Sequence, residues 1–320
     1  MNQQARAVVV ESPGHVRVRN VQVARPGPGE VLIRTACSVM SPGTERRVVA
    51  GQQPGLTYPL VPGYSAAGHV VEVGPGVDLA EGQLVVPGGI LATDIACAWG
   101  GHSELLLATA SSTLPVPAGV SAKQAACTKL LAIAQHGVWL ADPRPGDDVA
   151  VVGLGLIGQF VARLLAAIDG VRVQAGDVAE TRVRVAQAAG TNAVLLGADL
   201  APLSDDAFDI VFDATGHPPV LSEALRLLRP TPWGTRRRPP ALVVQGSYAE
   251  GFTLPYDPAF RKETRLLITR DEGPADRQAV LNLLASGKLN IDDILSHEIN
   301  PEAYDAIDSQ AHLTAVISWD

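Results

Sequence analysis

Residues 147–168, DDVAVVGLGLIGQFVARLLAAI, constrain the fold more than any other stretch of the chain. They predict a strand, a tight turn containing Gly153, Gly155 and Gly158, and a helix with apolar residues at helical spacing. In such a turn the first glycine permits the bend, the second admits a pyrophosphate close to the backbone, and the third lets helix and strand pack closely. The stretch therefore predicts the start of a dinucleotide-binding unit.

The cofactor residues follow from this unit. Leu156 and Ile157 open the helix, where backbone N–H groups and positive potential favour phosphates. Asp177 lies nineteen residues after Gly158, at the end of the next predicted strand, where a carboxylate accepts hydrogen bonds from the adenosine ribose. It also repels a 2′-phosphate, and no Lys or Arg directly follows it; Arg182 reaches either the adenine face or solvent. We therefore expect NAD(H) to be favoured over NADP(H).

Strands and helices alternate from residue 147 to about residue 270, which predicts a parallel sheet covered by helices. Thr215, Gly246 and Tyr248 follow two later strands of the series, FDIVFDATG and ALVVQGSY, and are expected along the cofactor, with Tyr248 near the nicotinamide. Asp213 is interpreted as support for that loop rather than as a chemical group.

The first third of the chain reads differently. Residues 5–115 hold short strands separated by Gly and Pro, which predicts a compact, barrel-like β domain. Ser121 and Gln124 form a capping box at the start of a helix. The tail holds two predicted helices and a closing strand and is too short to be a domain, so we expect it to pack onto the β domain. The predicted boundaries are 1–120 for the β domain, 121–269 for the nucleotide-binding domain and 270–320 for the returning segment.

Composition narrows the class of protein. At 320 residues with 47% apolar and 18% charged residues, the chain predicts a soluble two-domain protein. A net charge of −8 argues against nucleic acid as a partner, and the basic run 236–238 is interpreted as a solvated loop. No apolar run approaches the roughly 20 residues needed to span a membrane, and no signal peptide is evident. We expect a cytoplasmic location and, from three widely spaced cysteines, no disulfide framework.

The order of motifs is specific. With GEVLIRTACSVMSPGTE, VPGYSAAGHVVEVGPGV, GGHSELLL and VVGLGLIG, nearly the whole chain resembles the medium-chain dehydrogenase/reductases, the alcohol-dehydrogenase-like superfamily. Through YPLVPGY, DATG, PAFRKETRL and the terminal ISWD it is most similar to the bacteriochlorophyllide dehydrogenase branch. The resemblance implies an α/β protein, with a GroES-like β-barrel catalytic domain and a doubly wound, parallel-sheet Rossmann domain. It also implies a small-molecule substrate and a homodimer.

Zinc-dependent members of that superfamily hold a catalytic metal with three ligands. Carried over by position, these ligands fall on Pro42, Tyr64 and Lys129. Proline has no donor atom, a neutral tyrosine is a poor ligand and an ammonium repels the ion. The stretch matching the structural zinc lobe holds only Cys97. The resemblance therefore predicts a zinc-independent member with no bound metal.

Without a metal, another group has to polarise a carbonyl or hold an alkoxide. Lys129 shares a predicted helix face with alanines and Ile133, where burial lowers a lysine pKa toward the range useful for proton transfer; the alternative is a lysine extending to solvent. Tyr64 offers a phenol, or else packs against the cofactor or the barrel. Thr44 matches the proton-relaying hydroxyl of the superfamily. We assign catalysis to Lys129, Tyr64 and Thr44.

Three residues receive supporting roles. Glu45 matches an acid that supports the site in the superfamily, and His102 is expected to be a satisfied structural histidine more often than a catalytic one. Ser65 stands where relatives carry an acid, which indicates a rebuilt substrate pocket.

The sequence thus predicts an NAD(P)(H)-dependent dehydrogenase or ketoreductase that interconverts a secondary alcohol and a ketone on a bulky biosynthetic intermediate. Two alternatives stay open: a quinone or enoyl reductase of the same superfamily, and a nucleotide-binding protein without catalysis.

Overall fold

The computed structural model describes residues 2–91, 93–248, 251–306 and 312–319. The chain divides into two compact units: unit 1 comprises Met1–Leu130 and Arg277–Asp320, and unit 2 comprises Leu131–Asp276. The divisions fall within helix α3 (Thr128–Ala141) and helix α8 (Pro274–Ala285). They lie later in the chain than the predicted boundaries at 121 and 270, because both helices belong partly to each unit.

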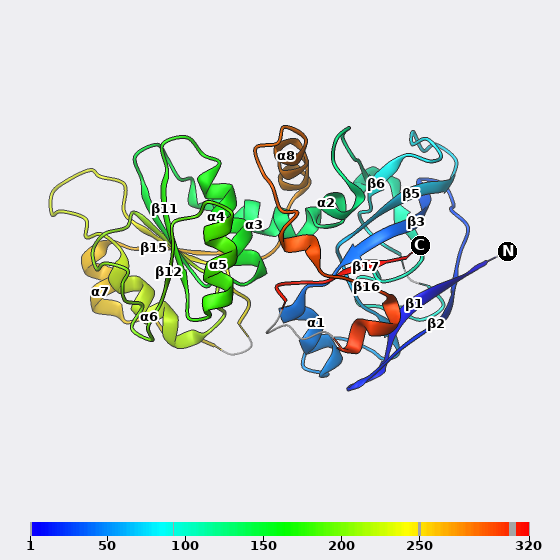
Figure 1. Ribbon diagram of the computed structural model, residues 1–320, viewed down its shortest axis with the longest axis horizontal. Helices are drawn as coiled ribbons and strands as arrows, with labels where there is room; N and C mark the ends of the chain where they lie inside the picture. Colours follow the sequence, from blue (N-terminus) through cyan, green and yellow to red (C-terminus); the bar gives the residue numbers. More distant parts are fainter. Residues whose placement is uncertain (1, 92, 249–250, 307–311, 320) are drawn as a thin grey trace. The chain divides into compact units, whose positions relative to one another are not determined.

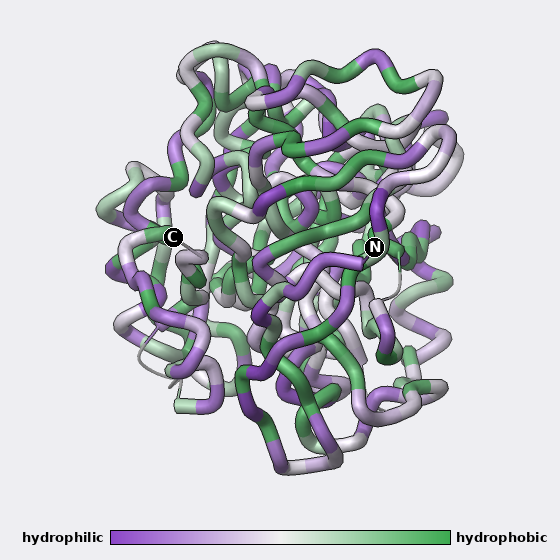
Figure 2. The backbone as a smooth tube through the Cα atoms, turned by 90° about the vertical axis from the view of Figure 1, so that its right-hand side faces the viewer, coloured by the Kyte–Doolittle hydropathy of each residue, from purple (hydrophilic) through white to green (hydrophobic). Residues whose placement is uncertain are grey.

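Unit 1 is built from short strands in two sheets. One sheet has the order β2-β1-β4-β7, and the other has the order β16-β17-β3-β5-β6-β9, with β8 paired to β3. Green and purple stretches alternate along its strands in Figure 2, as expected for strands with one buried face. The strands are β1 (Gln3–Ser12), β2 (His15–Val23), β3 (Glu30–Val39), β4 (Leu60–Val61), β5 (Ala66–Val73), β6 (Leu84–Val86), β7 (Ala96–Cys97), β8 (Leu105–Thr109) and β9 (Leu114–Pro115).

The returning tail completes the second sheet of unit 1. Strand β17 (Val316–Ser318) pairs antiparallel with β3, and β16 (Glu298–Ile299) pairs parallel with β17; in Figure 1 the red β17 lies beside the blue β3. Between β16 and β17 lies the second of the two helices predicted in the tail, expected over residues 301–310. It is a 3-10 helix, η3 (Pro301–Ala306), and the remaining predicted residues lie outside the described part of the chain.

Two helices of unit 1 differ from the sequence-based expectation. Helix α1 (Pro42–Val49) follows β3 directly, where only strands were expected. The single predicted helix that starts near residue 121 is divided at Cys127 into α2 (Ala122–Ala126) and α3. The capping box is confirmed: the Gln124 backbone N–H donates to Ser121 Oγ at 3.2 Å, and the Ser121 N–H donates to Gln124 Oε1 at 3.0 Å.

Unit 2 is the predicted doubly wound fold. Its six strands are all parallel, in the order β12-β11-β10-β13-β14-β15, and the order reverses between β10 and β13. Ligands of such sheets bind outside the carboxyl ends of the strands at this switch point. The strands are β10 (Asp148–Val152), β11 (Arg172–Asp177), β12 (Ala193–Leu195), β13 (Ile210–Asp213), β14 (Ala241–Val244) and β15 (Arg265–Ile268); the helices between them are α4 (Leu156–Ala166), α5 (Glu180–Ala188), α6 (Pro218–Leu227) and α7 (Tyr256–Lys262).

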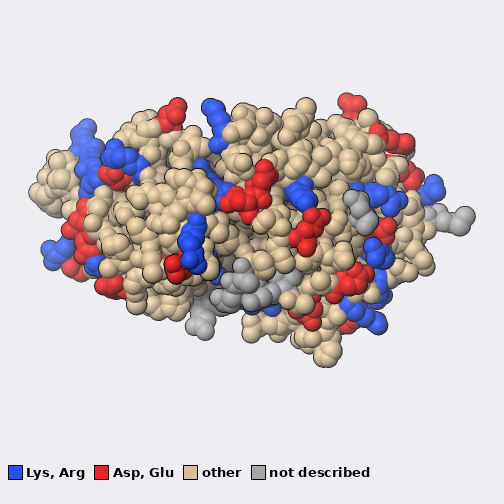
Figure 3. Space-filling view, in the orientation of Figure 1, with Lys and Arg blue, Asp and Glu red and all other residues tan. Residues whose placement is uncertain are grey.

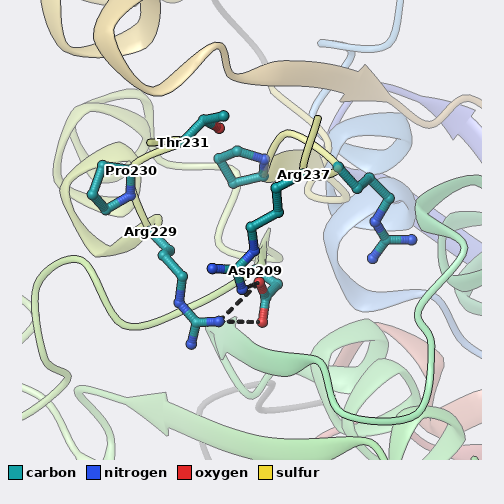
Figure 4. Close-up of a pocket in the computed structure, with 7 residues that line it drawn as sticks. Asp209, Arg229, Pro230, Thr231 and Arg237 are labelled. Carbon is teal, nitrogen blue, oxygen red and sulfur yellow. Dashed lines mark hydrogen bonds and ion pairs between the residues drawn. The ribbon is translucent and has the colours of Figure 1, made fainter. Parts of the chain in front are cut away.

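The opposite, amino-terminal edge of this sheet carries ion pairs. Asp209, just before β13, accepts from Arg229 through both carboxylate oxygens at 3.0 Å and from Arg237 at 2.9 Å (Figure 4). Arg238 of the same basic run pairs with Asp147. Basic and acidic side chains also lie next to one another over the face shown in Figure 3. The run 236–238 is therefore partly engaged in ion pairs within unit 2 rather than simply solvated.

A buried lysine at the end of α7 caps the C-terminus of helix α6. Lys262 is 9% exposed, and its ammonium donates to the carbonyls of Leu225, Arg226 and Leu228 and to Asp206 Oδ1, at 2.5–3.2 Å. The last carbonyls of a helix have no partner within the helix and carry its negative end, so a cation is favourable there. Lys262 thus joins α7 to α6.

We expect Lys262→Met to lower the free energy of unfolding by about 2–4 kcal/mol, since it leaves buried carbonyls and a carboxylate without their donor. Thermal and urea unfolding measure the loss. Arg261→Met is the matched control, because the side chain of Arg261 is 74% exposed and pairs only with exposed Asp257 in the described structure, so its loss of stability should be much smaller. Equal losses in the two variants would contradict this role of Lys262.

Candidate cofactor and catalytic site

The glycine turn of unit 2 has the geometry that a dinucleotide requires. Gly153 has a φ of +91°, and a Cβ at Gly158 would lie 1.8 Å from the Gly153 carbonyl oxygen. At Gly155, the N-cap of α4, a Cβ would meet no atom within 4 Å. The first and third glycines are therefore required by the fold itself, whereas the second borders open space. That space at a helix N-terminus is where a pyrophosphate approaches the backbone.

Asp177 lies at the end of β11 beside this turn. One of its oxygens accepts from the Leu154 N–H at 2.7 Å, and the other accepts from the Ala179 N–H at 2.8 Å. Arg182 approaches Asp177 Oδ2 at 3.5 Å. The carboxylate is thus fixed in the place expected for a ribose-binding acid, but a cation that sequence reasoning placed near adenine or solvent lies against it.

Gln159 is a member of this cluster that sequence reasoning missed. It is fully buried, and its amide donates to the Leu154 carbonyl at 3.3 Å and to the Arg182 carbonyl at 2.9 Å. It therefore joins the glycine turn to α5. Its position directly after the third glycine was the available signal, since that first helical turn faces the neighbouring strand.

Beyond the switch point, the predicted residues of the later loops lie together. Thr215 donates through its N–H and its hydroxyl to Asp213 Oδ1, at 2.9 and 2.6 Å, and Tyr248 donates its hydroxyl to Asp213 Oδ2. The Gly246 N–H donates to the Asp213 carbonyl at 2.8 Å. Asp213 is thus the centre of the group.

Unit 1 contains a buried polar network centred on Glu45. Its Oε1 accepts from the Ser41 N–H, and its Oε2 contacts His102 Nε2 and accepts from the Tyr304 hydroxyl, each at 2.8 Å. Glu45, His102 and Tyr304 are all less than 4% exposed. Burial, then the charge of Glu45 and the hydrogen bond to it, raises the pKa of Tyr304 well above its usual value, so the phenol stays protonated.

The protons of this network follow from its bonds. Ser38 Oγ accepts from Trp319 Nε1 at 3.0 Å and contacts His102 Nδ1 at 2.8 Å. Every polar hydrogen finds an acceptor when the Ser38 hydroxyl donates to Nδ1 and His102 carries its hydrogen on Nε2, toward Glu45. A neutral His102 beside an ionised Glu45 satisfies all the partners. The arrangement supports the structural interpretation of both residues.

Tyr64 and Ser65 make separate contacts at the start of β5. The Tyr64 hydroxyl donates to Ser41 Oγ at 2.6 Å, and its ring packs edge-on against Trp99 at 5.3 Å between centroids. Ser65 is buried, and its hydroxyl donates to the Ala126 carbonyl at 2.6 Å. Ser65 therefore anchors the end of α2 to β5, whereas its predicted effect on the substrate pocket stays a prediction.

The remaining predicted catalytic residues lie at helix starts. Thr44 is half-buried in the first turn of α1, and Lys129 is half-buried in the first turn of α3, three residues after the carbonyl that Ser65 binds. Sequence reasoning missed Ser38, Ser41, Tyr304 and Trp319. Ser41 had a local signal, because a serine before Pro42 with an acid in the following turn is typical of a helix N-terminus. Tyr304 and Trp319 come from the far end of the chain and had none.

Residues 27–118 match the family model of the alcohol dehydrogenase GroES-like domain. The chain is 30% identical over 302 residues to 2-desacetyl-2-hydroxyethyl bacteriochlorophyllide A dehydrogenase of Cereibacter sphaeroides, covering 91% of this chain and 89% of the relative. The chain belongs to the medium-chain dehydrogenase/reductase superfamily. The predicted superfamily, the fold and the general class, an NAD(P)-dependent oxidoreductase, are confirmed.

Solved structures agree with this fold. A short chain alcohol dehydrogenase of Escherichia coli CFT073, complexed with NADH, has a TM-score of 0.86 at 20% identity and covers 98% of this chain and 99% of its own. A Sinorhizobium meliloti dehydrogenase described as zinc-binding and bound to NADP has a TM-score of 0.83 at 22% identity, with 99% of each chain covered. Among the described residues of this chain, no helix combines the length and the apolar character that a membrane span needs.

The residues at the positions of the zinc ligands have other places and contacts in the structure. Pro42 is the first residue of α1, and the Tyr64 hydroxyl is engaged with Ser41. Across the described ranges, no three His, Cys, Asp or Glu side chains gather as metal ligands. The residues at the positions of the zinc ligands thus do not fit the metal, and the zinc independence of this superfamily member stays a prediction.

We expect Gly155→Ala to leave the stability of the protein unchanged, because the added methyl group enters open space and the backbone angles suit alanine. It should nevertheless weaken NADH binding at least about tenfold, since the methyl group occupies the approach of the pyrophosphate. Cofactor fluorescence titration and thermal unfolding check both parts.

Gly158→Ala is the contrasting variant. Its methyl group meets the Gly153 carbonyl oxygen, so it should lower the unfolding temperature as well as cofactor binding. Normal cofactor affinity in Gly155→Ala would show that the phosphates do not pass this glycine.

Proposed function

We propose that the protein is a zinc-independent NAD(P)(H)-dependent dehydrogenase or ketoreductase that interconverts a secondary alcohol and a ketone on a bulky biosynthetic intermediate. The observation that carries the proposal is Tyr64. It occupies a position where zinc-dependent members carry a metal ligand, and its phenol is held by the Ser41 hydroxyl at 2.6 Å. A fixed phenol is able to donate to a carbonyl oxygen, and so to replace the polarising role of a metal.

The residues of unit 2 fit the nicotinamide cofactor. The open space at Gly155 suits the pyrophosphate, and Asp177 suits the adenosine ribose. When bound, the nicotinamide supplies or accepts the hydride. The chain itself holds the cofactor and manages the proton of the substrate oxygen.

Ser41 suits a role in proton transfer because a hydroxyl both accepts and donates. It accepts from Tyr64 in the resting arrangement, and by rotation it returns a hydrogen bond to the phenolate that proton transfer leaves behind. Lys129 and Thr44 complete the proposed set: Lys129 supplies a positive charge that favours the phenolate, and Thr44 supplies a second hydroxyl near Ser41 in the chain.

The size of the substrate is inferred from relatives. The Cereibacter sphaeroides relative is named for a hydroxyethyl group on a bacteriochlorophyllide, a large ring system. Pigment chemistry is one case of the proposed class, and sugar or cyclitol ketones are another.

The superfamily and the sheet edge support a homodimer. Strand β15 ends the sheet of unit 2, and its Leu266 and Ile268 are 40% and 60% exposed. Apolar side chains on an edge strand are typical of strands that pair with another chain.

We expect Tyr64→Phe to lower kcat about 10²- to 10⁴-fold with little change in KM, because it removes the proton donor and keeps the ring against Trp99. Wild type is first screened with NADH and NADPH on ketones, alcohols, quinones and enones. Metal content is measured by mass spectrometry on the same preparation.

Tyr58→Phe is the matched control, since Tyr58 donates to the Val48 carbonyl in the last turn of α1, at the end of the helix away from Ser41, and should not affect turnover. Lys129→Met should lower activity and shift its pH profile. Stoichiometric zinc, or turnover confined to enones and quinones, would overturn the proposal; full activity in Tyr64→Phe would remove this residue from the reaction.

We further propose that NAD(H) is favoured over NADP(H), because the fixed carboxylate of Asp177 repels a 2′-phosphate. Asp177→Asn should narrow the preference for NADH, lowering the ratio of the NADPH dissociation constant to the NADH dissociation constant about tenfold or more. Arg182→Ala should widen it, since the guanidinium that offsets Asp177 is removed. Arg184→Ala, on the same helix and paired with Glu180, is the control and should leave the ratio unchanged. A wild-type preference for NADPH would contradict this proposal.

A further inference from the structure

Asp213 is the fully buried acid at the carboxyl end of β13. Its side chain accepts three hydrogen bonds: two from Thr215 to Oδ1, at 2.9 and 2.6 Å, and one from the Tyr248 hydroxyl to Oδ2. Thr215 lies in the loop after β13, and Tyr248 lies in the loop after β14. A single carboxylate therefore fastens two loops at the same edge of the sheet.

The backbone of these loops is packed without room for side chains. A Cβ at Gly246 would lie 2.3 Å from the Gly216 nitrogen, and a Cβ at Gly216 would lie 2.6 Å from the Ser247 carbonyl oxygen. The glycine turn joins the same assembly, because a Cβ at Gly153 would lie 2.8 Å from Thr215 Cγ2. The loop after β13 thus packs directly against the glycine turn, and the loop after β14 packs against the loop after β13.

The place of these loops in the sheet indicates which part of the cofactor they serve. Asp177 ends β11, on one side of β10, whereas β13 and β14 lie on the other side. A dinucleotide binds across the switch point with its adenosine half on the first side, so its nicotinamide half extends over β13 and β14. We therefore expect the nicotinamide half of the cofactor to lie on the two loops that Asp213 joins.

We propose that Asp213 is a positioning residue for the nicotinamide half of the cofactor and that Tyr248 acts through it. The carboxylate holds the loops after β13 and β14 in the one arrangement that also fits the glycine turn. This inference rests on the proposed function, because it assigns a role in the binding of its cofactor.

The charge of Asp213 makes this role dependent on pH. Burial raises the pKa of Asp213, and the bonds from Thr215 and the charge of His217 offset part of this rise. A protonated carboxyl group cannot accept all three hydrogen bonds, since one oxygen carries a hydrogen of its own. Cofactor affinity should therefore fall as acidification protonates Asp213. Tyr248, Thr215 and His217 are the polar or titratable groups described around it.

Dissociation constants for NADH, measured by fluorescence at 25 °C without substrate, test the role. Tyr248→Phe should raise the constant about three- to tenfold, the usual effect of one lost hydrogen bond to a charged acceptor. Asp213→Ala, which releases both loops, should raise it about a hundredfold. Asp213→Asn is the counterpart of the protonated acid, with one acceptor oxygen and one donor, so it should raise the constant about as far as full protonation of Asp213 does. Its acid-dependent loss of affinity should also disappear.

Asp209→Asn is the matched control. It changes the same kind of side chain at the opposite end of β13, where Asp209 pairs with Arg229 and Arg237, and it should lower stability without changing the dissociation constant. Equal constants in wild type and folded Tyr248→Phe, or a shift in Asp209→Asn as large as that in Tyr248→Phe, would overturn the inference. Because no substrate is present, a failure to find turnover bears on the proposed reaction alone.

Discussion

The hydrogen bonds to the buried carboxylate of Glu45 are the interactions on which the architecture of unit 1 depends. This carboxylate is buried in a β domain, and a buried charge is stable only when hydrogen bonds replace the water that it has lost. One replacement comes from Ser41, four residues earlier at the start of α1, and two come from distant parts of the chain, His102 before β8 and Tyr304 in the returning tail. The returning tail therefore has two roles in unit 1. Tyr304 supplies a hydrogen bond to the buried Glu45, and β17 pairs with β3.

Unit 2 meets a different constraint, that of backbone packed against backbone. The glycine turn, the loop after β13 and the loop after β14 approach so closely that Gly153, Gly158, Gly216 and Gly246 have no room for a Cβ. Gly155 has room on the side that the fold leaves open. The difference separates glycines that the fold needs from the glycine that a ligand needs, a distinction that the motif alone does not make.

The features that sequence reasoning predicted are local ones. The glycine turn, the capping box of Ser121 and Gln124, and the alternation that gives the parallel sheet are all encoded within about 20 residues, so periodicity and turn chemistry find them. The interactions that it missed join distant residues. Tyr304 meets Glu45 across 259 positions and Trp319 meets Ser38 across 281, and one sequence holds no signal for such pairs. Arg182 was close enough to consider, but its direction depends on how Gln159 holds the start of α5.

The same contacts separate the architectural groups of unit 1 from the candidate chemical one. The Tyr64 hydroxyl reaches Ser41 through the serine side chain, whereas Ser41 reaches Glu45 through its backbone N–H. A backbone amide does not release its proton at neutral pH, so these contacts provide no proton route from Glu45 or His102 to Tyr64. The buried acid therefore fixes the start of α1, and with it the hydroxyl that orients the phenol. If Tyr64 is the proton donor, as proposed, its proton has to be replaced through other groups, such as Thr44, Lys129 or solvent. In the proposed reaction, Glu45 and His102 would thus act by position, and Tyr64 by its phenol.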